Sequence, residues 1–151
     1  MRDDEAVGRL AQVLGIGVVT ASALVAGVGV GVGVGVGVGH DFKNGWQFAA
    51  WLGLVPRQHS TGGVPRLGCI TKRGDRYLCT LLVHGAGSEM ICTAGKLDAM
   101  SRWAESLRAR KGRNKACVAL ANKHASIAWV MLAKEQTFHP ACDGCMVMLT
   151  V

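Results

Sequence analysis

The chain has 151 residues, and its 17 Lys and Arg against 10 Asp and Glu give a formal net charge of +7 at pH 7. This length allows one ordinary domain with a hydrophobic core but hardly two, and the positive charge favours a polyanionic partner such as nucleic acid. Six cysteines are too few for a disulfide scaffold, and the acidic start lacks the cations of a secretory signal peptide, so we expect a cytoplasmic protein.

Residues 1–26 are predicted to form two helices joined by a tight turn. Leu10 and Val13 belong to an apolar face with helical spacing, and Gly15 and Gly17 lie in the turn. This pattern resembles a helix-hairpin-helix, in which such glycines let backbone amides approach a DNA phosphate. The alternative is a plain helical turn that binds nothing.

Glycine and valine alternate without interruption over residues 27–39. Ordering one Gly-Val unit costs about 2 to 4 kcal/mol of backbone entropy, whereas burying its valine returns about 1.5 to 3 kcal/mol. We therefore expect residues 27–40 to be a disordered low-complexity insertion. Residues 18–39 carry no charge and are long enough to span a bilayer, but so many glycines make a poor helix, so we expect no membrane span.

A small helical domain is predicted over residues 41–137, with few strands and a mainly α fold. Asn44 is a candidate cap of its first helix, which Gly53 and Pro56 end. The apolar positions that mark the four helices, and that we expect in the core, are Trp46, Phe48, Ala49, Trp51 and Leu52; Tyr77, Leu78, Leu81 and Leu82; Leu97, Met100, Trp103, Ala104 and Leu107; and Cys117, Leu120, Ala121, Ile127, Ala128, Met131 and Leu132.

The tail, residues 138–151, matches no pattern that we recognise. Cys142 and Cys145 form a C-x-x-C pair near His139, for which a metal or redox role is conceivable. No second pair lies at a zinc-like spacing, so we expect no metal site in this chain.

Two hydroxyls, those of Ser60 and Thr61, lie in a glycine-rich basic stretch over residues 53–63, directly after an apolar aromatic segment. Cations and glycines are again interleaved over residues 66–78, where backbone amides and side chains can both meet an anionic backbone. The pattern predicts a loop that brings a nucleophile close to a phosphate.

These stretches closely resemble the C-terminal domain of the bridge-RNA-guided insertion-sequence transposases, which pair a RuvC-like four-carboxylate domain with a serine transposase domain. The resemblance runs from about residue 10 to about residue 135 and is densest over residues 42–85. It implies that Ser60 attacks the DNA backbone to give a covalent phosphoserine, with Thr61 as the alternative hydroxyl. His59 is a weaker candidate as proton acceptor, because adjacent residues of an extended segment point apart. The cations placed to meet phosphates are Arg57, Arg66, Lys72, Arg73 and Arg76.

The resemblance also implies partners. DNA is the expected substrate, a guide RNA acts through the full-length enzyme, and the intact enzyme is expected to be a homo-oligomer. The four carboxylates hold divalent metal (Mg²⁺) in a domain that has no counterpart in this chain, so we expect a DNA-binding C-terminal piece that does not cut DNA alone. Two alternatives stay open: a non-catalytic DNA-binding module that regulates full-length transposase, and a small membrane-associated protein.

Several positions depart from the family pattern. Val64 and Pro65 follow the glycine pair where the family commonly has a lysine, and positions often held by arginine are here Trp46, Cys69, Cys79 and Cys92. Changes of cytosine to thymine in arginine codons give Cys or Trp, which suggests a decaying, truncated copy of a transposase.

Overall fold

A computed structural model describes residues 2–28, 42–92, 95, 98–134 and 137 of the chain. Most of the Gly-Val tract lies outside these residues, and so do His139, Cys142 and Cys145 of the tail. The predictions made for those segments are therefore not addressed by the structure.

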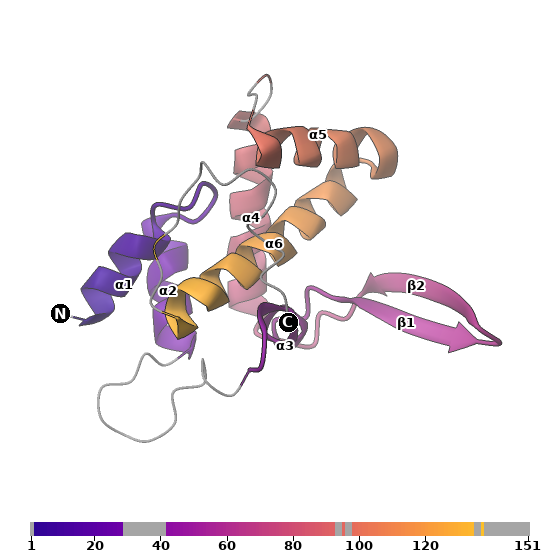
Figure 1. The fold of residues 1–151 in the computed structure, drawn as a ribbon, viewed down its shortest axis with the longest axis horizontal. Coiled ribbons are helices and arrows are strands. Elements are labelled where there is room, and N and C mark those ends of the chain that lie inside the picture. Colours follow the sequence, from indigo (N-terminus) through magenta and orange to yellow (C-terminus); the bar gives the residue numbers. More distant parts are fainter. Residues whose placement is uncertain (1, 29–41, 93–94, 96–97, 135–136, 138–151) are drawn as a thin grey trace.

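The described part is mainly α-helical, as the sequence predicts, with six helices and one two-stranded sheet (Figure 1). In chain order the elements are α1 (Arg2–Leu10), α2 (Val18–Val28), α3 (Gly45–Trp51), β1 (Pro56–Thr61), β2 (Val64–Ile70), α4 (Arg76–Cys92), α5 (Ala99–Lys111) and α6 (Arg113–Ala133). All four helices predicted after the Gly-Val tract are present.

The N-terminal helices α1 and α2 pack against each other and are joined by a tight turn, as predicted. Leu10 and Val13 are buried, and so is Ile16 within the turn itself. Gly15 has a φ of 88°, a left-handed conformation that favours glycine. The first residues of the Gly-Val tract still belong to α2, which ends at Val28.

Helix α3 begins where the sequence predicts a cap. The side chain of Asn44 accepts a hydrogen bond from the backbone N–H of Gln47 at 2.9 Å, which satisfies a donor that the helix itself leaves unpaired. Phe48 is fully buried beneath the rings of Phe42 and Trp51, with centroids 5.5 and 5.9 Å away. The helix thus closes the core with a small aromatic cluster.

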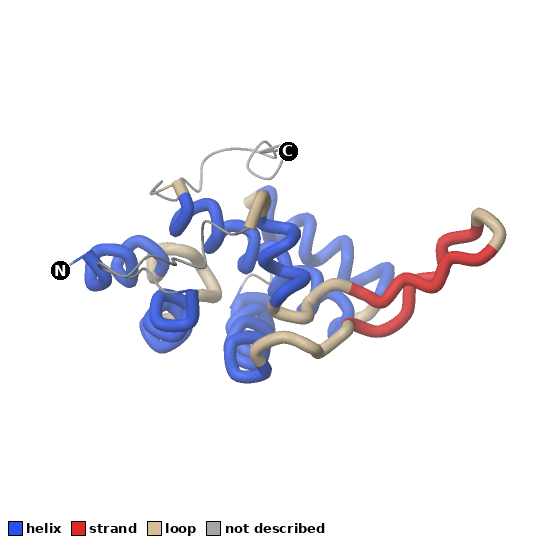
Figure 2. Tube along the Cα trace, turned by 90° about the horizontal axis from the view of Figure 1, so that it is seen from below, coloured by secondary structure: helices blue, strands red, loops and turns tan. Residues whose placement is uncertain are grey.

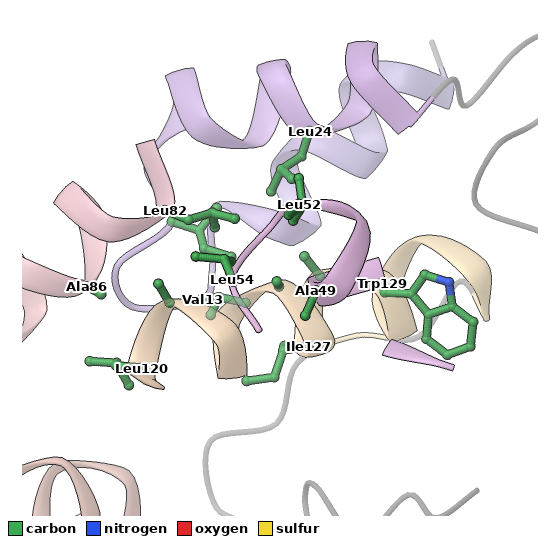
Figure 3. Packing of buried hydrophobic residues seen from close by; sticks show 14 of the residues in the cluster. Val13, Leu24, Ala49, Leu52, Leu54, Leu82, Ala86, Leu120, Ile127 and Trp129 are labelled. Atoms are coloured by element: carbon green, nitrogen blue, oxygen red, sulfur yellow. The ribbon is translucent and has the colours of Figure 1, made fainter. Parts of the chain in front are cut away.

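The core is built around α6, which contacts α1, α3, α4 and α5. Figure 3 shows buried side chains from several elements gathered around this helix, among them Leu82 of α4 and Ala49 of α3 beside Leu120 and Ile127 of α6. Small residues let the helices approach closely: a Cβ on Gly45 would lie 2.9 Å from the Cα of Ser126. Each leucine buried here stabilises the fold by about 1.5 to 3 kcal/mol.

A cation–π contact joins α5 to α6. The ammonium of Lys123 lies 4.4 Å from the ring centroid of Trp103, a cation–π contact. Burial lowers the pKa of Lys123, because desolvation disfavours its charged form.

Strands β1 and β2 form a hairpin that projects from the helical body (Figures 1 and 2). In both views the hairpin extends from one end of the molecule, and α1 and α2 lie at the other. The fold therefore separates the α1–α2 segment from the hairpin, the two segments predicted from the sequence to contact DNA.

Candidate nucleic-acid interface

The segment predicted as a loop around Ser60 is instead an antiparallel β-hairpin. The prediction was wrong because neither arm shows the alternation of apolar and polar residues that marks a half-buried strand. The signal lay in the turn. Gly62 and Gly63 have φ values of 66° and 78°, and two consecutive residues with positive φ are what a two-residue hairpin turn of type I′ requires.

The backbone register of the hairpin places the candidate residues near its tip. Ser60 pairs with Pro65, Thr61 with Val64 and His59 with Arg66. Alternate residues of a strand share a face, so His59 and Thr61 lie on the same face of β1. The role of His59 as a proton acceptor for Ser60 stays a prediction.

Close backbone contacts hold the root of the hairpin. The amide of Thr71 donates to the carbonyl of Val55 at 3.1 Å, and the amide of Lys72 donates to the carbonyl of Gly53 at 3.2 Å. Gly74 packs so tightly against the end of α3 that a Cβ would collide with the carbonyl oxygen of Trp51. The glycines at the root are thus needed for packing.

Lys72 is the one described residue other than glycine with a positive φ, 53°. A lysine in this left-handed conformation is uncommon. It directs the chain from β2 toward α4, whose start is capped by Asp75: its Oδ1 accepts hydrogen bonds from the amides of Tyr77 and Leu78 at 2.8 and 3.1 Å. The carboxylate of Asp75, the acid in this basic stretch, therefore caps α4 through hydrogen bonds to backbone amides.

The structure brings all five predicted phosphate-binding cations to the hairpin and its root, and all five are exposed. Arg57 also donates from Nη2 to the carbonyl of Thr71 at 3.4 Å, which holds its guanidinium near the root. We call this set the hairpin cations; they are Arg57, Arg66, Lys72, Arg73 and Arg76. Arg57 and Arg66 lie on the strands, Lys72 and Arg73 follow β2, and Arg76 begins α4. Exposed guanidinium and ammonium groups on the hairpin and at its root suit a row of phosphates.

Gly15 and Gly17 do not join the hairpin cations. They lie in the turn between α1 and α2, two helices on the side of the molecule away from the hairpin (Figure 1). Gly15 faces the core: a Cβ there would lie 2.6 Å from Cε1 of His124 and 2.7 Å from Oε2 of Glu89. Gly17 is exposed, with open space around it. Packing accounts for the glycine at position 15, and the contact of either glycine with DNA stays a prediction.

Several aromatic residues predicted in the core lie at the surface. Trp46 is 64% exposed and Tyr77 is 60% exposed. Both belong to the first turn of a short or capped helix, where one face always meets solvent, and helical spacing in the sequence does not say which face is covered. Trp103, Phe48 and the apolar residues of α6 pack in or against the core as predicted.

Within the described residues, no three His, Cys, Asp or Glu side chains come together as metal ligands would. These residues do not fit a divalent metal site, and the Mg²⁺ expected by resemblance concerns a carboxylate domain outside this chain.

One helix of the described part, α6, is long and apolar enough to cross a membrane by length and composition alone. Of its most apolar window, 61% is buried inside the protein, which is typical of the core helix of a soluble domain. The part of residues 18–39 that the structure describes is the shorter apolar helix α2.

Comparison with known proteins shows what the chain is similar to. Residues 7–101 match the model of the "Transposase IS116/IS110/IS902 family". The chain is 51% identical over 140 residues to a "Probable family 20 transposase" of Pseudomonas aeruginosa, covering 93% of this chain and 39% of that protein. It is 41% identical over 130 residues to the transposase for insertion sequence element IS1111A of Coxiella burnetii, covering 86% of this chain and 34% of that protein.

A third relative, the transposase for insertion sequence element IS1328 of Yersinia enterocolitica, is 38% identical over 138 residues, with 91% of this chain and 39% of that protein covered. The chain thus spans between about a third and two fifths of the length of these relatives. The matched region contains the whole hairpin and every hairpin cation. Because the family match covers more than half of its residues, the chain belongs to the IS116/IS110/IS902 transposase family.

Proposed function

We propose that this chain is a cytoplasmic, DNA-binding part of an insertion-sequence transposase, and that Ser60 is its nucleophile for DNA strand cleavage and exchange. The observation that carries the proposal is the exposed hairpin, in which Ser60 lies next to the tip residue Thr61 and the hairpin cations follow from Arg57 to the root at Arg76. Membership of a transposase family supports DNA as the substrate.

Electrostatics supports the same assignment. A strand of DNA carries one negative charge per phosphate, and cations that neutralise phosphates release bound counterions, so binding is favourable and depends on salt. The hairpin cations are exposed, two on the strands and three at the root, and the described residues of the strands are exposed or, like Ile70, only partly buried. An isolated two-stranded hairpin is marginally stable in water, so a polyanion along its length would also order it.

In the proposed reaction the hydroxyl oxygen of Ser60 attacks a DNA phosphorus. A bond forms between that oxygen and phosphorus, the bond from phosphorus to one sugar oxygen breaks, and the sugar oxygen leaves with a proton as a hydroxyl. The hairpin cations neutralise charge on the phosphate oxygens as the bond changes take place. The divalent metal, when bound by the carboxylate domain of the intact enzyme, supplies further charge stabilisation.

The described residues of this chain include no group that fits that metal, so we propose that the chain binds DNA but does not cut it alone. The guide RNA and the homo-oligomer expected of the intact enzyme are part of the same proposal.

The test is formation of a covalent protein–DNA adduct. The purified chain is mixed with a separately produced carboxylate domain of a relative, its guide RNA, labelled target DNA and Mg²⁺, and adducts are separated on a denaturing gel. The proposal expects an adduct with the unchanged chain and with Thr61→Ala, but none with Ser60→Ala. Mass spectrometry of the digested adduct should place the nucleotide on Ser60.

Thr61→Ala is a matched control, because Thr61 carries the neighbouring hydroxyl in the same strand. An adduct that survives Ser60→Ala and is lost in Thr61→Ala would identify Thr61, not Ser60, as the nucleophile. DNA binding without an adduct, under conditions in which the intact relative forms one, would favour the non-catalytic module.

A further inference from the structure

A second basic surface lies where α5 ends and α6 begins. A single residue, Gly112, joins the two helices, with φ 86° and ψ 162°. Five cations lie within eight residues of the chain, and all five are exposed. We call them the basic corner: Arg108, Arg110, Lys111, Arg113 and Lys115.

Contacts within the fold account for only part of this charge. Arg108 lies 3.4 Å from Glu105, an exposed ion pair along α5. Nε of Arg110 donates to the backbone carbonyl of Ser106 at 3.4 Å, which is not an acidic partner. In the described part of the chain, Lys111, Arg113 and Lys115 form no ion pair.

The helix dipoles favour the cations at the end of α5 but disfavour those at the start of α6. Arg108, Arg110 and Lys111 lie in the last turn of α5, where the negative end of the dipole favours cations. Arg113 and Lys115 lie in the first turn of α6, a 21-residue helix with no acid in that turn, where the positive end of the dipole repels them. These two residues weaken the helix start, so an anionic partner is the better explanation for their presence.

We propose that the basic corner binds the phosphate backbone of duplex DNA, as a second contact beside the hairpin. The junction of α5 and α6 lies toward the same end of the molecule as the hairpin (Figure 1). A continuous duplex presents phosphates at regular spacing to both surfaces. Residues 108–115 include no aromatic side chain on which an unpaired base would stack, which favours duplex backbone over single strands. The inference rests on the proposed function only in that DNA is the substrate.

Three double variants, each of which removes two exposed cations, test the proposal. The corner variant carries Arg113→Gln and Lys115→Gln, and the hairpin variant carries Arg66→Gln and Arg73→Gln. A control variant carries Lys43→Gln and Lys134→Gln, two exposed cations that belong to neither set. Binding of the full chain to a fluorescent duplex of about 30 base pairs is measured by anisotropy between about 50 and 200 mM salt.

The corner variant should bind the duplex roughly tenfold more weakly than the control, and the slope of log K against log salt should fall by about 2, one for each lost phosphate contact. Its thermal midpoint should equal or exceed that of the unchanged chain, because two cations that repel the start of α6 are gone. Weaker binding together with an unchanged or higher thermal midpoint shows that the two cations act in DNA binding and not in folding.

If the corner variant matches the control while the hairpin variant binds weakly, the corner inference is wrong and the proposed function stands. If none of the proteins shows salt-dependent binding to DNA, the proposed function fails as well. A stem-loop RNA is measured in parallel, and a loss confined to that RNA overturns the assignment of the corner to duplex DNA.

Discussion

Nε2 of His124 lies 2.7 Å from Oε2 of Glu89 in the protein interior, where the two side chains are only 1% and 4% exposed. This is within ion-pair distance, and the contact is an ion pair when His124 is protonated. The pair joins α4 to α6 directly beneath Gly15. Three segments far apart in the chain therefore meet at one buried polar contact.

Removal of either partner should destabilise the protein strongly. Glu89→Leu leaves the imidazole buried without its partner, and His124→Leu leaves the carboxylate, so each should lower the free energy of unfolding by about 3 to 5 kcal/mol. The double variant should lose less than the sum of the two, because neither buried polar group then remains without its partner. Urea unfolding followed by circular dichroism measures all three. Glu105→Gln, which breaks the exposed pair with Arg108, should cost only about 0 to 1 kcal/mol.

Two glycines of α4 should respond in opposite ways to alanine. A Cβ on Gly85 would collide with the carbonyl oxygen of Gly15, so Gly85→Ala should push the α1–α2 turn away from α4 and lower the free energy of unfolding by about 1 to 3 kcal/mol. Gly87 has nothing within 4 Å of its Cβ position. Gly87→Ala should raise the free energy of unfolding by about 0.5 to 1 kcal/mol, since alanine is the better helix former. Equal effects of the two variants in chemical denaturation would contradict the close contact.

The tip of the hairpin should depend on the left-handed conformation of its two turn residues. Gly63→Val forces a β-branched residue to a positive φ and should open the strand ladder, whereas Gly62→Asn gives the Asn-Gly pair that suits a type I′ turn. Nuclear Overhauser contacts between His59 and Arg66, which pair across the strands, report on the ladder. They should vanish in Gly63→Val and persist in Gly62→Asn. The thermal midpoint of the helical body should stay the same in both, and a large fall would show that the hairpin supports the core.

The thiol of Cys79 should be less reactive near neutral pH than an exposed thiol. Partial burial raises the pKa of Cys79, and the nearby positive charge of Lys72 opposes this shift in part. A raised pKa leaves less thiolate at pH 7 to 8, so alkylation should be slow there and accelerate as the pH rises through the raised pKa. Lys72→Gln should slow it further.

Iodoacetamide labelling at several pH values, read by peptide mass spectrometry, measures each cysteine separately. Cys69 is exposed on the hairpin and serves as the internal reference, and the buried Cys117 should react slowest in the folded protein. Labelling of Cys79 as fast as that of Cys69 at pH 7 would contradict the effect of burial.

The helices could be predicted because each carries a local signal. The apolar spacing of Leu120 and Ile127 within α6 and the cap at Asn44 are properties of neighbouring residues, and the structure confirms both. The exposed side of a helix is a different matter. Trp46 is apolar and yet lies at the surface, because no described residue covers that side of α3.

The hairpin and the buried pair could not be predicted in the same way. Neither arm of the hairpin shows the alternation of apolar and polar residues that marks a half-buried strand, so only the two turn glycines gave a sign of strands. The contact between Glu89 and His124 forms across 35 positions of sequence, and polar residues at helical spacing ordinarily indicate a solvated face. The hairpin cations were predicted as a group because they lie close to Ser60 in the sequence. They lie at the hairpin and its root because this whole segment, residues 56–76, folds as one local unit.

The tight root formed by Gly53 and Gly74 makes the projecting arm independent of the body that bears it. Beyond that root, substitutions alter what the arm can touch without disturbing the helices that hold it. Such a division predicts that chimaeras exchanged at these two glycines will fold.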